Sequence, residues 1–299
     1  MRTAVGILNV SWASVFSDLK ELTKVRLALS VVFSSIAGYF LGVSTLQITS
    51  LLLLGFGGYC MVGASNAYNQ IIEKDLDGLM NRTKNRPLPS GRMPVSTAMI
   101  TAIIMTIMGV LALYLVNPKT ALFGAISIFL YTSVYTPLKT ITPLSVFVGA
   151  IPGAIPFMLG WVAATNEFGI EAGTLFMIQF FWQFPHFWAL GWMLDEDYKK
   201  GGFKMLPTGK KDAATLLQII LYTIWMIVIS IMPVFGITGR LILSIPSAII
   251  ILIMGLCMLI FAFRLYEKRN NKAAKNLMLA SVLYITLMQV VFVADKFLR

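Results

Sequence analysis

Long apolar runs alternate with short polar segments along the whole chain. Each run holds about twenty residues, the length that a helix needs to cross roughly 30 Å of hydrocarbon. Four prolines crowd the fourth and fifth runs, at Pro137, Pro143, Pro152 and Pro156. Proline is tolerated in a membrane helix when neighbouring helices satisfy the freed carbonyls. The pattern predicts nine membrane spans, at about 27–46, 48–68, 97–116, 119–137, 141–164, 172–193, 214–236, 240–263 and 276–294.

The composition excludes an ordinary soluble domain. Of the 299 residues, 58% are hydrophobic and 12% are charged, whereas soluble domains carry roughly 25% charged residues. The mean hydropathy is +0.80. No linker or low-complexity tract divides the chain, so we expect a single domain over residues 1–299, with residues 1–20 forming a segment on the membrane surface. The fold class is predicted to be an all-α polytopic membrane protein embedded in the lipid bilayer.

The net charge of +11 is unevenly divided between the two sides of the predicted bundle. With nine spans, 20 of the 24 Lys and Arg residues fall on the side of the N-terminus. Loops rich in Lys and Arg remain cytoplasmic. We therefore predict a multi-pass protein of the cell (inner) membrane with a cytoplasmic N-terminus. Topology explains the positive charge, so no nucleic-acid partner is expected.

The second span runs into a dense polar segment, N-Q-I-I-E-K-D-L-D-G-L-M-N-R-T-K-N-R-P-L-P-S-G. Asn69, Glu73 and Asp77 in it are spaced four residues apart, so they share one face of a helix. Three basic residues follow within about two turns: Arg82, Lys84 and Arg86. Carboxylates beside such cations suit a polyphosphate chelated by Mg²⁺. The alternative is a solvated helix end whose charges serve solubility and topology.

A second acidic cluster follows the sixth span as D-E-D-Y-K-K-G-G-F-K, from Asp195 to Lys204. Asp77 and Asp197 are 120 residues apart, about the length of four helices and their loops. This weak internal symmetry predicts two pseudo-repeated four-helix halves plus one helix around a central cavity. Both acidic clusters would then lie at one cytoplasmic mouth, across the cavity from each other.

His186, the only histidine, lies within the sixth predicted span in Q-F-P-H-F-W. An ionisable side chain inside a span is costly and is a functional hypothesis by default. It precedes Asp197 by eleven residues, so a continuous helix would place it on the same side about 16 Å deeper. The alternative is a structural histidine that is hydrogen-bonded to a neighbouring helix.

Taken together, N-Q-I-I-E-K-D-L-D, R-T-K-N-R-P-L and the later acidic loop resemble the UbiA superfamily of intramembrane prenyltransferases. Within it, the chain is similar to the protohaem IX farnesyltransferases in three segments: W-Q-F-P-H-F-W-A-L-G-W-M, D-Y-K-K-G-G-F-K-M-L-P and Y-T-P-L-K-T-I-T-P-L-S-V-F-V-G-A-I-P-G-A-I-P-F-M-L-G-W. The resemblance covers roughly residues 20–295. It implies a nine-helix bundle around a central cavity and Mg²⁺-dependent transfer of a farnesyl group from farnesyl diphosphate to haem B.

The resemblance implies a first metal-diphosphate motif, consisting of Asn69, Glu73 and Asp77. Arg82 and Arg86 would contact the phosphates. The superfamily usually has Asp where this chain has Glu73, but a glutamate also ligates a hard cation.

The resemblance also implies a second motif, to which Asp195, Asp197 and Lys200 would belong. The sequence here is D-E-D rather than two aspartates four residues apart. Which of Asp195, Glu196 and Asp197 binds metal therefore stays open.

The chemistry that the resemblance implies begins with ionisation, because Mg²⁺ and basic groups draw off the diphosphate and leave an allylic cation. The 2-vinyl group of haem attacks this cation, and water captures the cation that results. His186 would ligate the haem iron or position that water. Lys139 would pair with a haem propionate or serve topology alone. A downstream haem-modifying enzyme is a further partner compatible with this activity.

Two other functions compete with this interpretation. Another prenyltransferase of the same superfamily would act on a quinone precursor, and the Q-F-P-H-F-W segment argues against it. A transporter would place charged or broken-helix elements deep in the membrane, whereas nearly all the acidic residues here lie at one predicted mouth.

Overall fold

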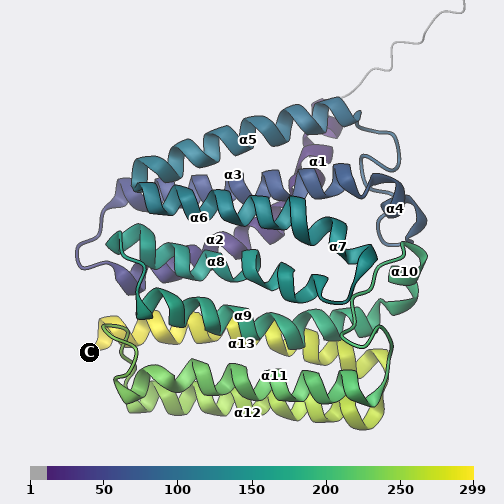
Figure 1. Cartoon of the computed structure of the whole chain (residues 1–299). Coiled ribbons are helices and arrows are strands. Elements are labelled where there is room, and N and C mark those ends of the chain that lie inside the picture. The colour runs from purple at the N-terminus through teal and green to yellow at the C-terminus, as the bar shows by residue number, and fades with distance from the viewer. Residues whose placement is uncertain (1–11) are drawn as a thin grey trace, which may run out of the picture.

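The computed structural model describes residues 12–299, which form helices and connecting loops without a β-strand (Figure 1). Residues 1–11 of the predicted surface segment lie outside this range, and α1 extends three residues beyond its predicted end. The helices are α1 (Trp12–Thr23), α2 (Val25–Gly42), α3 (Ile48–Ile72), α4 (Lys74–Leu79), α5 (Val95–Val116), α6 (Pro118–Phe129), the π-helix η1 (Leu130–Tyr135), α7 (Thr136–Ile141), α8 (Ser145–Thr165), α9 (Ile170–Met193), α10 (Asp195–Lys200), α11 (Ala213–Ile231), the 3₁₀-helix η2 (Met232–Phe235), α12 (Ile245–Lys268) and α13 (Asn271–Leu298).

Eight helical segments of the described chain are long and apolar enough to cross a membrane. They are Val25–Gly42, Ile48–Ile72, Val95–Val116, Pro118–Ile141, Ser145–Thr165, Ala213–Phe235, Ile245–Lys268 and Asn271–Leu298. The remaining predicted span, 172–193, corresponds to α9, which has 24 residues and packs against α8, α11 and α13. It is less apolar because Gln179, Gln183 and His186 interrupt it. The all-helical membrane fold is confirmed, and the count of nine spans stays a prediction.

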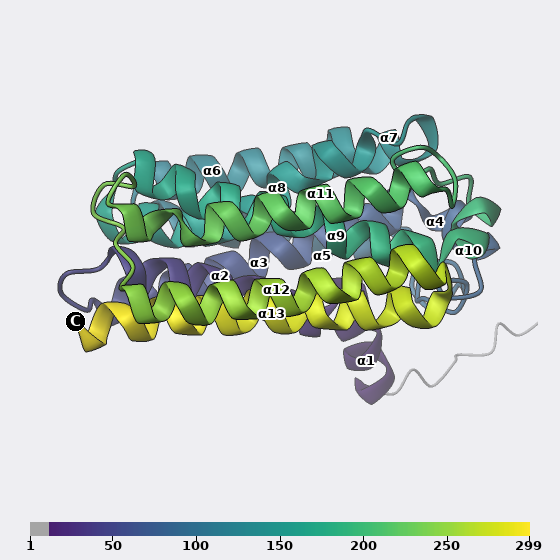
Figure 2. The ribbon, with the colours of Figure 1, turned by 90° about the horizontal axis from the view of Figure 1, so that it is seen from below.

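The bundle is built from two similar halves, α2 to α7 and α8 to α12, followed by α13 (Figures 1 and 2). In each half the second long helix breaks and continues as a helix of six residues, α4 or α10. The breaks occur at Glu73 (φ −94°, ψ 7°) and Leu194 (φ −103°, ψ 13°), which are 121 residues apart. Both short helices lie at the same end of the bundle, beside α7. This arrangement agrees with the internal symmetry predicted from the acidic clusters.

The first helices of the two halves, α2 and α8, approach each other closely at two glycines. A Cβ on Gly38 would lie 2.0 Å from the Phe157 carbonyl oxygen, and one on Gly160 would lie 1.9 Å from the Ser35 carbonyl oxygen. Small residues allow membrane helices to approach in this way. Gly38 and Gly160 are 122 residues apart, as are Ser35 and Phe157. The contact is therefore itself symmetric and joins the two halves.

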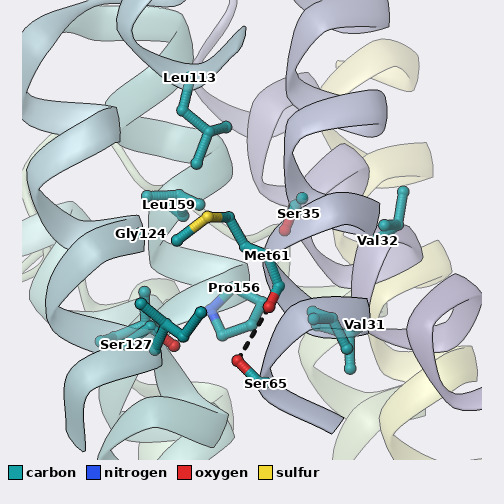
Figure 3. A pocket seen from close by; sticks show the side chains of 14 residues that line it. Val31, Val32, Ser35, Met61, Ser65, Leu113, Gly124, Ser127, Pro156 and Leu159 are labelled. Atoms are coloured by element: carbon teal, nitrogen blue, oxygen red, sulfur yellow. Dashed lines mark hydrogen bonds between the residues drawn. The ribbon is translucent and has the colours of Figure 1, made fainter. Parts of the chain in front are cut away.

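A small cavity of about 40 Å³ lies between α2, α3, α6 and α8 (Figure 3). No residue of either acidic cluster lines it, so the central cavity with the acidic clusters at its mouth stays a prediction. Outward-facing residues such as Ile100, Ile104 and Leu111 are large, apolar and exposed, as expected for a surface in contact with lipid.

Candidate active site

The three residues predicted to share a helix face lie where α3 passes into α4. The helix is not continuous there, because Glu73 departs from helical geometry. The hydrogen-bond ladder nevertheless continues, from Glu73 N to Asn69 O (2.9 Å) and from Asp77 N to Glu73 O (2.7 Å). Asn69, Glu73 and Asp77 are 2%, 4% and 1% exposed, respectively. They consequently all face the protein interior, whereas Asp75 between them is exposed.

Each buried carboxylate of this group contacts a basic side chain. Lys139 Nζ on α7 donates to Glu73 Oε1 at 2.7 Å, and Arg86 Nη1 donates to Asp77 Oδ2 at 2.6 Å. Asn69 Nδ2 donates to Thr136 Oγ1 at 3.2 Å. Buried charges require such partners. Two acidic and two basic groups are thus paired at this end of the bundle.

Aromatic rings lie beside these ion pairs, and no motif in the sequence predicts them. Lys139 Nζ lies 4.6 Å from the ring centre of Tyr135 and 5.6 Å from that of Phe203. Tyr131 and Tyr135 have ring centres 5.2 Å apart and come from the π-helix η1. Short π-helical turns occur frequently at functional sites. The chain signals this one only through Pro137, which interrupts the ordinary helical ladder.

The loop after α4 brings the predicted phosphate contacts to the same end of the bundle. Thr83 Oγ1 donates to the Asp77 carbonyl at 2.8 Å and fixes the turn that carries Arg86 inward. Arg86 is half-buried, whereas Arg82 and Lys84 are exposed. The Arg82 guanidinium carbon lies 5.8 Å from the ring centre of Tyr198 on α10. Arg86 thus contacts the first acidic cluster, and Arg82 lies beside Tyr198 of the second.

The second acidic cluster meets the first through Asp197. Its carboxylate accepts hydrogen bonds from the backbone N–H of Asn81 (2.8 Å) and of Arg82 (3.2 Å). Lys200 Nζ is 3.8 Å from Asp197. Asp195 is buried and pairs with Lys199 at 2.8 Å, whereas Glu196 is exposed. Asp197 therefore links the two clusters, and Asp195 is the buried acid of the second.

Lys24 is a further charged residue near these ion pairs. It is one of the 20 basic residues on the N-terminal side, whose charge was attributed to topology. It connects α1 to α2 in a left-handed backbone conformation (φ 48°, ψ 59°). Side chains from α3 hold this connection, since Gln70 Nε2 donates to Leu22 O (2.7 Å) and Asn66 Nδ2 to Thr23 O (3.3 Å). Burial, together with the positive charges of Arg86 and Lys139, lowers the pKa of Lys24 to about 7.

Tyr198, the buried residue beside the second cluster, experiences the same environment. Burial raises the pKa of its phenol, against the opposing influence of Arg82 and Lys139. Its hydroxyl therefore stays protonated at neutral pH and can donate a hydrogen bond to an anion.

His186 lies on α9, apart from the acidic clusters, and its side chain contacts α13. Its Nδ1 is 2.8 Å from Ser281 Oγ, and Ser281 Oγ donates to the Met278 carbonyl at 2.7 Å. A neutral ring that donates from Nδ1 in this contact would leave the Nε2 lone pair free. The ring stacks on Trp182 (4.9 Å, 19°). α9 ends at Met193 and Asp197 lies on α10, so the continuous helix on which the alignment of His186 with Asp197 depends is interrupted at Leu194, and the alignment stays a prediction.

The donor atoms of the first cluster fit Mg²⁺. Glu73 and Asp77 supply carboxylate oxygens and Asn69 a carbonyl oxygen, the hard ligands that this ion prefers. Within residues 12–299, no three His, Cys, Asp or Glu side chains are close enough to share a metal ion. A Mg²⁺ ion held by these residues would complete its octahedron with phosphate oxygens and water.

The fold and the site together define a polytopic helical membrane protein with paired acidic and basic side chains gathered at one end of its bundle. The chain belongs to the UbiA prenyltransferase family, whose sequence model matches residues 31–287. Protoheme IX farnesyltransferase from Flavobacterium psychrophilum is 69% identical to it over 289 residues, covering 96% of each chain. The enzyme of that name from Cytophaga hutchinsonii is 43% identical over 290 residues, covering 95% of this chain and 99% of the relative.

Solved structures share the fold. A structure of digeranylgeranylglyceryl phosphate synthase superposes with a TM-score of 0.78 at 18% identity, covering 95% of this chain and 99% of the other. A UbiA homolog from Archaeoglobus fulgidus bound to GPP and Mg²⁺ has a TM-score of 0.66 at 16% identity, covering 93% and 99%. At these identities the similarity establishes the architecture alone.

Proposed function

We propose that this protein transfers a farnesyl group from farnesyl diphosphate to the 2-vinyl group of protohaem IX (haem B), with addition of water, giving haem O and diphosphate. The observation that carries the proposal is the pair of buried carboxylates, Glu73 and Asp77, each in contact with a basic side chain. The acceptor is inferred from relatives called protoheme IX farnesyltransferase. The donor class is supported by the homolog bound to GPP and Mg²⁺.

Asn69, Glu73 and Asp77 would hold the Mg²⁺ ion. When bound, the ion neutralises the diphosphate and makes it a better leaving group. Asp195 is our preferred ligand from the second cluster because it is buried, while the Asp197 carboxylate already binds two backbone N–H groups. That Asp197 also binds the metal ion stays a prediction.

The basic side chains at this end of the bundle would bind the diphosphate. Lys139 and Arg86 lie against the carboxylates and can reach non-bridging oxygens of a donor bound there. Because Lys139 pairs with Glu73, we assign it to the phosphate and not to a haem propionate. Arg82 and Lys24 would stabilise the charge that develops on the leaving group, and Lys200 would contact it from the second cluster.

The allylic cation would form beside the tyrosine rings of η1. When the bond from C1 to oxygen breaks, its electron pair leaves with the diphosphate. Tyr131 and Tyr135 can face the cation with their rings. The vinyl group then forms the carbon–carbon bond, water adds to the new cation, and one proton is released.

His186 would serve the haem. With its proton on Nδ1, the nitrogen that contacts Ser281, the ring would offer Nε2 to the haem iron as a ligand. An iron–histidine bond shifts the haem absorption bands on binding. If His186→Ala leaves these bands unchanged but lowers hydration of the product, the residue instead positions the water.

The orientation is proposed from charge. Since 20 of the 24 basic residues fall on the N-terminal side of the predicted spans, we place that side, with α4 and α10, in the cytoplasm of a cell with the protein in its inner membrane. A product anchored by a farnesyl chain remains in the bilayer, where a downstream haem-modifying enzyme would collect it.

The test uses purified protein in detergent with haem B, farnesyl diphosphate and Mg²⁺, analysed by mass spectrometry. We expect farnesylated, hydrated haem from the wild type and a loss of about 10²-fold or more in rate for Asp77→Ala. Asp75→Ala is the matched control, because Asp75 is exposed on the same short helix. The product should also disappear when Mg²⁺ is chelated.

Other outcomes would redirect the proposal. Diphosphate release with a quinone precursor, but none with haem, would keep a prenyltransferase and discard the haem acceptor. Coupled flux in liposomes without any diphosphate release would favour a transporter.

A further inference from the structure

His186 on α9 is held by α13, the helix that follows the two halves of the bundle. The two helices pack side by side (Figure 1). His186 Nδ1 is 2.8 Å from Ser281 Oγ, and the Trp182 indole N–H donates to the Ser281 carbonyl at 2.6 Å. Trp182 precedes His186 by about one helical turn. Ser281 is therefore joined to α9 twice, once through its backbone and once through its hydroxyl.

The neighbouring rings fix the plane of the imidazole but not which edge of it faces α13. The ring stacks on Trp182 with centres 4.9 Å apart and planes inclined by 19°, and it lies nearly perpendicular to the Phe187 ring at 5.3 Å. A half-turn about the Cβ–Cγ bond would keep this plane and exchange each nitrogen with a carbon. Only a hydrogen bond distinguishes the two orientations. The contact with Ser281 is thus what selects the edge that carries Nδ1.

Ser281 does more than a hydroxyl that bonds only within its own helix. Serine and threonine inside helices commonly donate to a carbonyl one turn earlier, as Thr223 Oγ1 does to the Ile219 carbonyl on α11 (2.7 Å). Ser281 Oγ makes the same kind of bond to the Met278 carbonyl at 2.7 Å and also contacts His186. A hydroxyl has a single hydrogen. When that hydrogen is given to the Met278 carbonyl, the oxygen can only accept from the imidazole.

We propose that Ser281 is the positioning residue of His186: its hydroxyl, held by the Met278 carbonyl, accepts the Nδ1 proton and so presents an unprotonated Nε2 to the haem iron. This role of Ser281 rests on the haem function proposed for His186. Histidines that ligate a metal almost always donate their second ring N–H to an acceptor, and losing that acceptor typically lowers metal affinity about 10–100-fold. Here the acceptor is supplied by α13, which gives that helix a part in substrate binding.

The first test reads the proton directly. Because His186 is the only histidine, nitrogen NMR of protein carrying isotope-labelled histidine reports on this ring alone. Protonated and unprotonated ring nitrogens resonate far apart, and couplings to the ring hydrogens identify each. At a pH where the ring is neutral, we expect the proton on Nδ1 in the wild type. In Ser281→Ala and Ser281→Cys, whose side chains accept a hydrogen bond weakly or not at all, the proton should distribute between the two nitrogens.

The second test titrates haem B into the same proteins and follows its absorption bands. We expect Kd to rise about tenfold or more in Ser281→Ala, and the band shift to disappear in His186→Ala. Gln289→Met is the matched control. Gln289 Nε2 on α13 donates to Gln179 Oε1 on α9 at 3.2 Å, so this variant weakens the same pair of helices at a different point. It should lower the melting temperature and leave both the nitrogen resonances and the haem Kd unchanged.

A proton on Nε2 in the wild type, or resonances and a haem Kd that Ser281→Ala leaves unchanged, would overturn the role of Ser281. A band shift that persists in His186→Ala would refute the iron-ligand role of His186 and, with it, the presentation of Nε2 to haem. The resonances would still decide whether Ser281 fixes the ring. Failure of prenyl transfer in protein that binds haem through His186 would refute the proposed reaction and leave the role of Ser281 intact.

Discussion

Lys24 has a charge that is unfavourable for folding and favourable for binding an anion. Desolvation and the neighbouring charges of Arg86 and Lys139 lower its pKa to about 7, so the protonated amine is destabilised in the folded protein. The unfolded chain binds this proton more tightly. The stability of the folded state should therefore rise as pH increases above about 7, and the full penalty applies below that pH.

Lys24→Gln should accordingly raise the melting temperature and lower the affinity for the donor. The stability gain should be largest below about pH 7 and shrink at higher pH, because the wild-type lysine then becomes neutral. KM for the prenyl diphosphate should rise about tenfold, as expected for losing a hydrogen bond to a charged group. Thermal unfolding across pH and initial rates measure the two effects. Lys20→Gln, exposed on α1, is the control, and a lower melting temperature for Lys24→Gln at pH 6 would contradict this account.

The short helices α4 and α10 are joined by hydrogen bonds from the Asp197 carboxylate to the backbone of Asn81 and Arg82. This carboxylate crosses from one half of the molecule to the loop of the other. Its removal would leave two N–H groups without their partner and release the loop that carries Arg82 and Arg86.

Asp197→Ala should therefore loosen the loop after α4. We expect faster hydrogen exchange at residues 80–86, and KM for the donor to rise by about tenfold, since losing such bonds costs about 1–3 kcal/mol. Glu196→Ala, which removes an exposed acid from the same helix, should change neither quantity. If Asp197→Ala abolishes turnover while the exchange pattern stays that of the wild type, Asp197 acts as a metal ligand and not as a clamp.

Local spacing predicted the parts of the site that lie on one element. Asn69, Glu73 and Asp77 fall together as expected because the hydrogen-bond ladder continues through the break at Glu73. The alignment of His186 with Asp197 assumed one continuous helix, and no Pro or Gly at Leu194 signals the break that separates α9 from α10. Lys24 and Tyr135 were missed because they reach the site only through packing between distant segments. Their roles depend on tertiary contacts that no spacing rule contains.

At the scale of the whole molecule, the site depends on how the two halves are held together. Glu73, Asp77 and Lys139 belong to the first half, and Asp195 and Asp197 belong to the second. The internal repeat was predictable because both halves carry an acidic cluster at equivalent positions. The symmetric glycine contact between α2 and α8 was not predictable. The chain has 23 glycines, and no sequence rule selects the two that lie at this contact.

Gly160→Ala should thus impair activity from a position remote from the chemistry. The added Cβ would lie 1.9 Å from the Ser35 carbonyl oxygen and 2.4 Å from the Tyr39 backbone nitrogen, so α2 and α8 must separate. Overpacking of this kind typically costs about 1–3 kcal/mol, and we expect a lower melting temperature together with a reduced kcat.

Gly173→Ala on α9 provides the opposite case, because a Cβ there meets no atom within 4 Å. Replacing a helical glycine without a clash should raise stability by about 0.5–1 kcal/mol. Thermal unfolding and turnover of the two variants, measured side by side, separate the close contact from the general effect of glycine. Equal melting temperatures for the two variants would mean that this contact does not hold the two halves together. The geometry of the site would then depend on α13, which packs against α2 and α9.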